Sequence, residues 1–316
     1  MTGPTGSGKS ALAIELAESW PLEIVAMDSM TLYRQMNIGT AKPSMADRAR
    51  VPHHLLDLLD PWESGNVAWW LDRAAEVCEG IRKRGKRPLF VGGTPFYLKA
   101  LLFGLFDAPP SDPALRTRLE AEASAVGPRE FHARLAAIDP KSAARLHPND
   151  TRRLVRAREV WELTGQPLSA FQQTWRSASF AGGAAGAESM SDTTVANHRR
   201  CLVIDWPRPL LYERIDSRVQ AMLAAGWLDE VRQLRELPHP LSPEASRALG
   251  YRELSDYLEG RAGSWDTTVE TIQMRTRQFA KRQLTWFRSL EGSRWFSADQ
   301  SDLRNHLEQL LASYFK

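Results

Sequence analysis

Short apolar runs alternate with amphipathic segments along the first hundred residues. Three apolar runs, at residues 22–28, 53–60 and 87–93, each have the length of a buried strand. Between them, residues 10–20 and 66–85 carry apolar side chains at intervals of three and four, the spacing of an amphipathic helix. Strands that alternate with helices predict a parallel, doubly wound sheet.

The pattern changes after this region, because helical periodicity continues without strands. An Asp-Pro pair opens a predicted helix at residues 112–127, and an Asn-Asp pair caps another at residues 149–165, which ends on glycine. Residues 177–197 are rich in small side chains and have no periodicity, which predicts a loop. The run at residues 201–206 predicts a strand, and amphipathic helices follow to the end of the chain.

This order predicts an α/β fold, with a parallel sheet flanked by helices as in P-loop NTPases and with an all-helical insertion domain. We expect residues 1–111 and 199–316 to form the core with the C-terminal helices, and residues 112–198 to form the insertion. An independent second domain is the alternative. The alanine- and glycine-rich stretch at residues 181–187 has no functional interpretation.

The composition is that of a folded globular protein: of 316 residues, 43% are hydrophobic and 25% are charged. No apolar stretch approaches the roughly 18 residues of a membrane span, and no basic-then-apolar leader stands at the start. We therefore expect a cytoplasmic protein without a membrane partner. The two cysteines, Cys78 and Cys201, are expected to be buried free thiols.

Positive charge is concentrated in three stretches, although the formal net charge is only +3. Residues 82–87, 151–158 and 275–288 are each rich in arginine and lysine. One such stretch is as often a solvated surface as a binding site, but three in one chain favour a polyanionic partner.

The sequence GPTGSGKS has the spacing of a phosphate-binding loop. Glycines let backbone amides converge on anionic oxygens, Lys9 neutralises the terminal phosphate, and the Ser10 hydroxyl is the expected ligand of Mg²⁺. The predicted diphosphate-binding residues of this loop are Gly3, Pro4, Thr5, Gly6, Ser7, Gly8, Lys9 and Ser10. Such a loop normally follows a buried strand, yet only Met1 and Thr2 precede it. We therefore expect that the start codon is assigned too late or that the chain is truncated. In either case the first strand would be missing from the centre of the sheet, and its neighbouring strands would lack backbone partners.

The predicted strand ends bear on which phosphate compound the loop holds. A kinase or ATPase has an acidic residue after a strand to help hold magnesium, but the run at residues 87–93 is followed by Thr94. The acidic residue, Asp28, ends the first run instead. Because ligands bind at the carboxyl ends of strands, Asp28, Thr94 and the glycine loop are expected to converge on one crevice. An ordinary turn aspartate is the alternative interpretation of Asp28.

Seven motifs follow one another along nearly the whole chain. They are GPTGSGKS, DSMTLYRQMNIGTAKP, FVGGTPFYLKALL, HPNDTRRLVRAREV, RIDSRVQAMLAAGWLDEV, LGYRE and RQFAKRQLTWFR. Together they resemble the bacterial tRNA dimethylallyltransferase family, and the second is specific to that family and its near relatives. The resemblance implies transfer of the dimethylallyl group from dimethylallyl diphosphate to N6 of the adenosine at position 37 of tRNA, 3′ of the anticodon, with release of diphosphate.

The resemblance also assigns roles. Asp28 is the implied general base and Thr94 hydrogen-bonds the bridging oxygen, while Arg218 holds the diphosphate with Arg214 assisting. The implied cofactor is Mg²⁺, and the implied partners of a monomer are the donor and a tRNA anticodon stem-loop. The implied tRNA-binding residues are Asp28, Ser29, Met30, Thr31, Arg152, Arg153, Leu154, Val155, Arg156, Arg247, Gly250, Tyr251, Arg252, Lys281, Arg282, Trp286 and Arg288. Phe287, in the last motif, is interpreted as a core residue.

Three other functions stay open. The loop also suits an ATP-dependent kinase of a small metabolite or nucleotide, prenyl transfer to free adenine nucleotides is a second alternative, and RNA binding without catalysis is a third. The absence of a carboxylate near Thr94 argues against the kinase. The helical insertion and the basic C-terminal helix favour a large RNA acceptor over a nucleotide.

Overall fold

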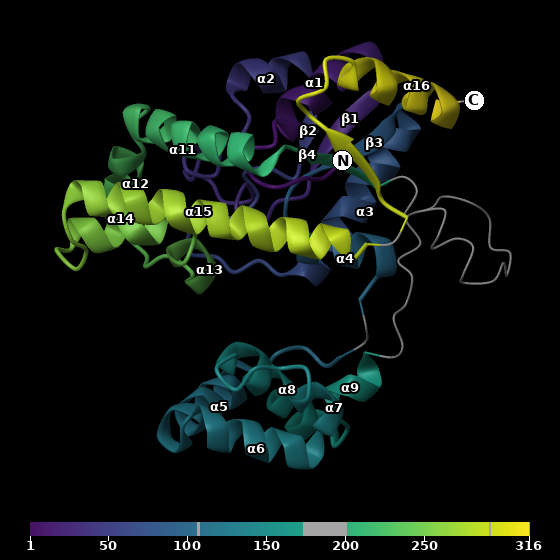
Figure 1. Cartoon of the computed structure of the whole chain (residues 1–316). Helices are drawn as coiled ribbons and strands as arrows, with labels where there is room; N and C mark the ends of the chain where they lie inside the picture. Colours follow the sequence, from purple (N-terminus) through teal and green to yellow (C-terminus); the bar gives the residue numbers. More distant parts are fainter. Residues whose placement is uncertain (106–107, 173–200, 291, 316) are drawn as a thin grey trace, which may run out of the picture. The chain divides into compact units, whose positions relative to one another are not determined.

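The computed structural model describes residues 1–105, 108–172, 201–290 and 292–315 (Figure 1). The chain separates into two compact units, one formed by Met1–Leu102 with Phe180–Lys316 and the other by Phe103–Ser179. The predicted loop at residues 177–197, with its alanine- and glycine-rich part, lies outside the described residues.

The sheet of the first unit contains two groups of parallel strands. The strands are β1 (Leu22–Ala26), β2 (His53–His54), β3 (Arg87–Val91), β4 (Leu202–Asp205) and β5 (Arg294–Ser297). The order is β2-β1-β3 in one group and β4-β5 in the other, with Ile24 opposite both His53 and Leu89. All five residues of β1 are buried, which is typical of a parallel strand covered on both faces.

Met1 and Thr2 join the two groups of strands. The Thr2 amide donates to Leu202 O at 2.7 Å, and the Ile204 amide donates to Thr2 O at 2.8 Å. On the other side, Thr2 forms a parallel bridge with Gly92, and its hydroxyl donates to Gly92 O at 2.8 Å. The expectation that neighbouring strands lack backbone partners is therefore wrong at this position, where two residues supply the pairing of a strand.

Two predictions about strands need correction. The apolar run at residues 53–60 pairs with β1 only at its first two residues. Beyond them the chain turns, with Leu55 and Asp57 at φ of 62° and 54°, and the amides of Leu58 and Leu59 donate to Leu32 O. Strand β5 lies where we expected only helices, because its four residues show no alternation of buried and exposed side chains.

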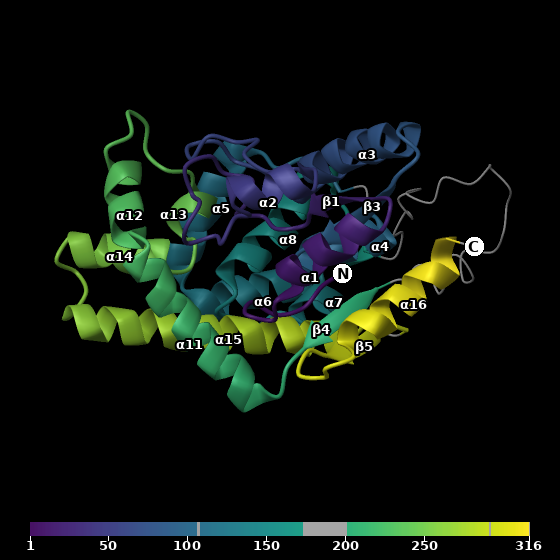
Figure 2. The ribbon, with the colours of Figure 1, turned by 90° about the horizontal axis from the view of Figure 1, so that it is seen from above.

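Helices cover the sheet and continue to the end of the chain (Figures 1 and 2). Those of the first unit, with α4 ending at its border, are α1 (Lys9–Ser19), α2 (Met45–Arg50), α3 (Val67–Lys83), α4 (Pro95–Phe103), α11 (Arg208–Ala224), α12 (Trp227–Arg235), α13 (Pro243–Ser246), α14 (Tyr251–Leu258), α15 (Trp265–Arg288) and α16 (Leu303–Phe315). A core that includes Ile14, Ile204 and Leu307 joins α1, β4 and α16. Helices α11 and α15 pack against each other through Ile215 and Leu284. No helix in the described ranges is long and apolar enough to cross a membrane.

The second unit is helical throughout its described secondary structure. Its helices are α5 (Pro113–Val126), α6 (Pro128–Ile138), α7 (Pro140–Ala143), α8 (Thr151–Thr164) and α9 (Leu168–Phe171). They pack around their own apolar core, in which Leu119, Phe131 and Leu154 are fully buried. The carboxylates of Asp112 and Asp150 accept hydrogen bonds from the first-turn amides of α5 and α8, which confirms both predicted helix starts.

Candidate active site

The glycine loop follows a path that requires its glycines. Gly6 and Gly8 have φ of 82° and 81°, a region that other residues rarely adopt, and α1 begins directly afterwards at Lys9. A Cβ on Gly3 would lie 2.3 Å from Ile204 O, so a side chain is excluded there as well. The loop therefore presents backbone rather than side chains at the N-terminus of α1, where the helix dipole favours an anion.

Two side chains contact the outside of the glycine loop: Trp206, which comes just before α11, and Arg214, which lies within α11. Trp206 Nε1 donates to Ser7 O at 3.0 Å, and Arg214 Nε donates to Gly6 O at 3.1 Å. The Arg214 guanidinium also stacks over the Trp206 ring at 4.3 Å from its centroid. In a trans peptide the N–H points away from the preceding C=O, so holding Ser7 O directs the Gly8 amide away from Trp206. Arg214 is thus engaged with the loop backbone.

Three charged side chains, Lys9, Asp28 and Arg218, interact beside the loop. Burial raises the pKa of the Asp28 carboxyl, whereas a hydrogen bond from the Met30 amide at 2.9 Å and the charges of Lys9 and Arg218 oppose that shift. Burial lowers the pKa of Lys9 to about 8, and the positive charge of Arg218 acts in the same direction. Within the described residues Arg218 has no hydrogen bond or ion pair. Two cations therefore face one carboxylate, which leaves net positive charge available to an anion.

Thr94 stands where β3 ends and α4 begins. Its Oγ1 accepts a hydrogen bond from the Ser29 amide at 3.3 Å, which links the ends of β3 and β1. A Cβ on Gly92 would lie 1.9 Å from Met27 O, so only glycine permits this approach. The strand ends bring Asp28 and Thr94 together beside the glycine loop.

Gln283 of α15 connects the two sides of this site. Its Oε1 accepts from the Thr5 amide at 2.9 Å, and its Nε2 donates to Gly93 O at 2.6 Å. The residue is 2% exposed. It lies inside a motif that we quoted for the family resemblance, but its role was not predicted, because 278 residues separate it from Thr5.

A side chain of α12 binds the backbone of the segment that follows Asp28, at Asn37 and Ile38. The buried carboxylate of Glu230 accepts from the amides of Asn37 and Ile38 at 2.9 and 2.8 Å, and from the Tyr251 hydroxyl at 2.6 Å. The sequence prediction did not include Glu230. A signal was present, because this carboxylate lies three residues after Trp227 on the apolar face of its helix.

Tyr251 and Gly250, which are both predicted to bind tRNA, are packed against α12. Tyr251 is buried, burial raises the pKa of its hydroxyl, and that hydroxyl binds Glu230. Gly250 has φ of 86°, and a Cβ there would lie 2.0 Å from the Trp227 ring. Both residues are buried, so a contact of either with tRNA stays a prediction that the packing of their side chains does not support.

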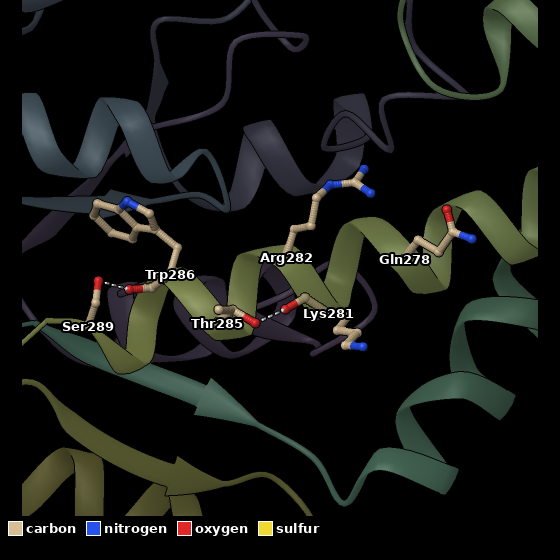
Figure 3. A pocket seen from close by; sticks show the side chains of 6 residues that line it. All are labelled: Gln278, Lys281, Arg282, Thr285, Trp286 and Ser289. Carbon is tan, nitrogen blue, oxygen red and sulfur yellow. Dashed lines mark hydrogen bonds between the residues drawn. The ribbon is translucent and has the colours of Figure 1, made fainter. Parts of the chain in front are cut away.

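An exposed face of α15 combines basic and aromatic side chains around a groove of about 580 Å³. The groove is lined by Gln278, Lys281, Arg282, Thr285, Trp286 and Ser289 (Figure 3). Arg282 and Trp286 extend to the same side of the helix, and Lys281 lies on the adjoining flank. Arg288 is exposed one turn further along, with its guanidinium over the Trp295 ring. Phe287 is fully buried, which confirms its interpretation as a core residue.

In the second unit, the predicted RNA-binding residues of α8 divide into exposed and buried sets. Arg152 and Arg153 are exposed in the first turn. Leu154 and Val155 are fully buried in the core of the unit. Their side chains pack in this core, so any contact of these two residues with RNA, which stays a prediction, would have to use their backbone.

Arg156 is engaged within its own unit. It donates to the buried carboxylate of Glu159 and to Pro109 O, both at 2.6 Å. Two other predicted contacts, Arg247 and Arg252, are exposed.

The basic stretch at residues 82–87 is largely occupied by internal contacts. The buried carboxylate of Glu23 pairs with Arg84 at 2.6 Å and with Lys86 at 3.5 Å. Arg87 donates to Tyr314 O. Most of the charge of this stretch is therefore engaged in contacts within the protein.

The described residues offer few side-chain ligands for a metal ion. No group of three His, Cys, Asp or Glu side chains in the described residues could hold a metal ion. Ser10 is exposed in the first turn of α1, where its hydroxyl can share a metal with a bound phosphate. This arrangement fits a divalent cation whose other ligands are diphosphate oxygens and water.

The family comparisons cover nearly the whole chain. The model described as "IPP transferase" matches residues 31–290, and the model described as "Isopentenyl transferase" matches residues 1–57. A tRNA dimethylallyltransferase from Geobacter metallireducens is 46% identical over 288 residues, covering 90% of this chain and 87% of the relative. One from Bordetella petrii is 46% identical over 291 residues, covering 92% and 88%.

Solved structures agree with these sequence matches. A tRNA isopentenylpyrophosphate transferase from Bacillus halodurans has a TM-score of 0.68 at 33% identity, covering 99% of this chain and 94% of that one. A eukaryotic dimethylallyltransferase acting on tRNA has a TM-score of 0.75 at 26% identity, covering 99% and 77%. The chain therefore belongs to the IPP transferase family and is a prenyltransferase of the tRNA dimethylallyltransferase type.

Proposed function

We propose that this chain transfers the dimethylallyl group of dimethylallyl diphosphate to N6 of adenosine 37 in tRNA. The observation that carries this assignment is the pair of cations, Lys9 and Arg218, beside a single carboxylate, Asp28, with Thr94 at the neighbouring strand end. The cations suit a diphosphate, and the carboxylate suits proton removal from the acceptor.

The donor side has to stabilise a departing diphosphate. As the C1–O bond breaks, negative charge accumulates on the bridging and terminal oxygens, which Lys9, Arg218 and the loop amides are placed to stabilise. The Thr94 oxygen already accepts from the Ser29 amide, so its own hydrogen is free to be donated. A hydrogen bond to the bridging oxygen would strengthen as that oxygen becomes anionic.

The acceptor side requires a base. N6 attacks C1, the new C–N bond forms as the C–O bond breaks, and the N6 proton passes to Asp28. Burial raises the pKa of this carboxyl, which makes its ionised form a stronger proton acceptor, and the charges of Lys9 and Arg218 favour that ionised form. A stacked adenine cannot present N6 to a protein site, so the base must be extruded from the anticodon loop.

We assign the divalent cation as Mg²⁺, held by the Ser10 hydroxyl and the diphosphate. When bound, it would neutralise part of the charge on the leaving group.

The exposed cations supply surfaces for RNA. On α15, Lys281 and Arg282 suit phosphates and Trp286 suits a stacked base. On α8, Arg152 and Arg153 offer two further phosphate contacts. We further propose that the reaction takes place in the cytoplasm, because its acceptor is a tRNA, and that a single chain carries it out.

The decisive experiment is incubation with isotopically labelled dimethylallyl diphosphate and tRNA, followed by nucleoside analysis. We expect label on N6 of the adenosine 3′ of the anticodon. A parallel reaction with ATP tests the kinase alternative, and competition between AMP and an anticodon stem-loop tests the free nucleotide. ATP turnover without prenylation of RNA, or preferential labelling of AMP, would overturn the assignment.

A further inference from the structure

We propose that Gln283 is a positioning residue that couples RNA binding on α15 to the geometry of the donor site. The inference rests on the proposed function, since it concerns how the same site responds to its RNA acceptor. It concerns a side chain that touches neither substrate but holds both loops around the diphosphate.

The hydrogen-bond pattern fixes the orientation of the Gln283 amide. The Thr5 amide can only donate, so Oε1 must face it, and Gly93 O can only accept, so Nε2 must face that atom. A rotated amide would leave four polar groups without partners, namely the Thr5 amide, Gly93 O and both atoms of the Gln283 amide. One side chain therefore sets the distance between the glycine loop and the segment that carries Thr94.

The contact between Gln283 and Gly93 requires that residue 93 have no side chain. A Cβ on Gly93 would lie 2.6 Å from Gln283 Nε2, so a side chain there would displace the amide. The peptide that joins Gly93 to Thr94 is held through its carbonyl oxygen. Its plane, and with it the backbone of the residue proposed to contact the bridging oxygen, therefore depends on Gln283.

The same helical turns also carry the groove that we propose to bind RNA. Lys281, Arg282 and Trp286 lie within three residues of Gln283 and line that groove (Figure 3), whereas Gln283 is buried. Because these side chains share the same turns of α15, a displacement of those turns by RNA contacts would also displace the hydrogen bonds to Thr5 and Gly93. RNA and diphosphate would thus act on the same turns of one helix.

This arrangement predicts reciprocal coupling between the two ligands. Binding of an anticodon stem-loop should tighten binding of a non-reactive thiolodiphosphate analogue of the donor, by about fivefold or more, and the analogue should tighten RNA binding by the same factor. Gln283→Met keeps the length and volume of the side chain but removes both hydrogen bonds. We expect the coupling factor to fall to near one and kcat to fall by about tenfold to a hundredfold, with the affinity for RNA alone unchanged.

Two further variants keep the test independent of folding defects. Gln283→Glu retains the acceptor for Thr5 but removes the donor to Gly93, and we expect an intermediate loss of coupling. Gln273→Met is the matched control, because Gln273 is a half-buried glutamine of the same helix whose amide donates to Asp216 O at 3.4 Å, away from the donor loops. It should retain both kcat and coupling, and thermal melting of each variant monitors folding.

The outcomes separate this inference from the proposed function. If the wild-type chain prenylates RNA but Gln283→Met keeps kcat and coupling, or if both Gln283 variants lose only thermal stability, the positioning role is wrong. If the wild-type chain transfers no dimethylallyl group to RNA, the proposed function itself fails. A Gln273→Met variant that loses coupling to the same extent would show a general effect of helix α15 and would also reject the assignment to Gln283.

Discussion

Lys9 and Arg218 in the donor site differ from Arg152, Arg153 and Lys281 on the surface, although we expect all five cations to meet phosphates. Burial lowers the pKa of both donor-site cations, and they share one carboxylate. The surface cations are exposed to solvent, where salt screens each charge. The cost of removing cations from water is therefore concentrated in the donor site, whereas RNA binding is divided among many weaker contacts.

The two helices that we propose to bind RNA differ in a similar way. Beneath its exposed arginines, α8 has Leu154 and Val155 in the core of its own unit, so its inner face has only a packing role. Beneath its groove, α15 has Gln283 in the donor site. Changes on α8 should therefore alter RNA affinity alone, whereas changes on α15 can alter catalysis as well.

The largest expected effect is at Asp28. Asp28→Asn retains the oxygen that accepts from the Met30 amide but cannot take up the N6 proton. We expect kcat to fall by about 10²–10⁴-fold, while the affinity for an anticodon stem-loop stays close to wild type. Single-turnover transfer and fluorescence anisotropy measure the two quantities. A variant with nearly full activity would reject Asp28 as the base and remove the contrast between donor site and surface.

The next effect concerns the protonation of Lys9. Its pKa is lowered to about 8, so the free protein holds this cation charged below that pH and loses the proton above it. A bound diphosphate favours the charged form, so binding above pH 8 must take up a proton. We expect the affinity for the thiolodiphosphate analogue to fall by up to about tenfold per pH unit above pH 8, and to be independent of this group well below it.

Calorimetry in two buffers of different ionisation enthalpy tests the proton uptake directly. Lys9→Arg is the control, because its guanidinium stays charged throughout the range; this variant should bind less tightly but without the alkaline decline. A wild-type profile that stays level up to pH 10 would contradict the lowered pKa.

Local patterns were sufficient to predict the glycine loop, most strands and the helix caps. The spacing of Gly8, Lys9 and Ser10 determines the loop and the start of α1, and Asp112 and Asp150 cap the helices that they were predicted to cap. These features depend on residues within one or two turns of each other. Sequence periodicity captures such short-range interactions well.

Contacts between distant segments could not be predicted. Glu230 binds a loop almost 200 residues earlier in the chain, and Gln283 binds Thr5 across 278 residues. Sequence composition alone also does not show which arginine of a basic helix faces inward, as Arg156 does. Strand β5 is identified only by its pairing with β4, because its four residues lack the alternation of buried and exposed side chains that indicates a strand.

A smaller effect is expected at Tyr251, where a substitution distinguishes a packing role from a role in RNA binding. Tyr251→Phe removes the hydroxyl that donates to the buried Glu230 carboxylate. We expect the free energy of unfolding to fall by about 1.5–3 kcal/mol, measured by urea denaturation, with RNA affinity unchanged. The exposed neighbour Arg252 provides the control, since Arg252→Ala should alter stability by less than about 0.5 kcal/mol. A loss of RNA affinity without loss of stability in Tyr251→Phe would return this residue to the RNA surface.

The smallest effect is at the start of α8, where the role of the second unit is tested. Replacing Arg152 and Arg153 together by alanine removes two exposed cations and no core contact. If both meet phosphates, the slope of log K against log salt for tRNA binding should decrease in magnitude by about 1.4 to 1.8, with kcat at saturating tRNA unchanged. Arg156→Ala is the contrasting variant, because it breaks the contacts to Glu159 and Pro109 and should lower stability instead. An unchanged salt slope in the double variant would mean that this turn of α8 faces solvent in the complex, and that the groove on α15 accounts for more of the RNA contact than we propose.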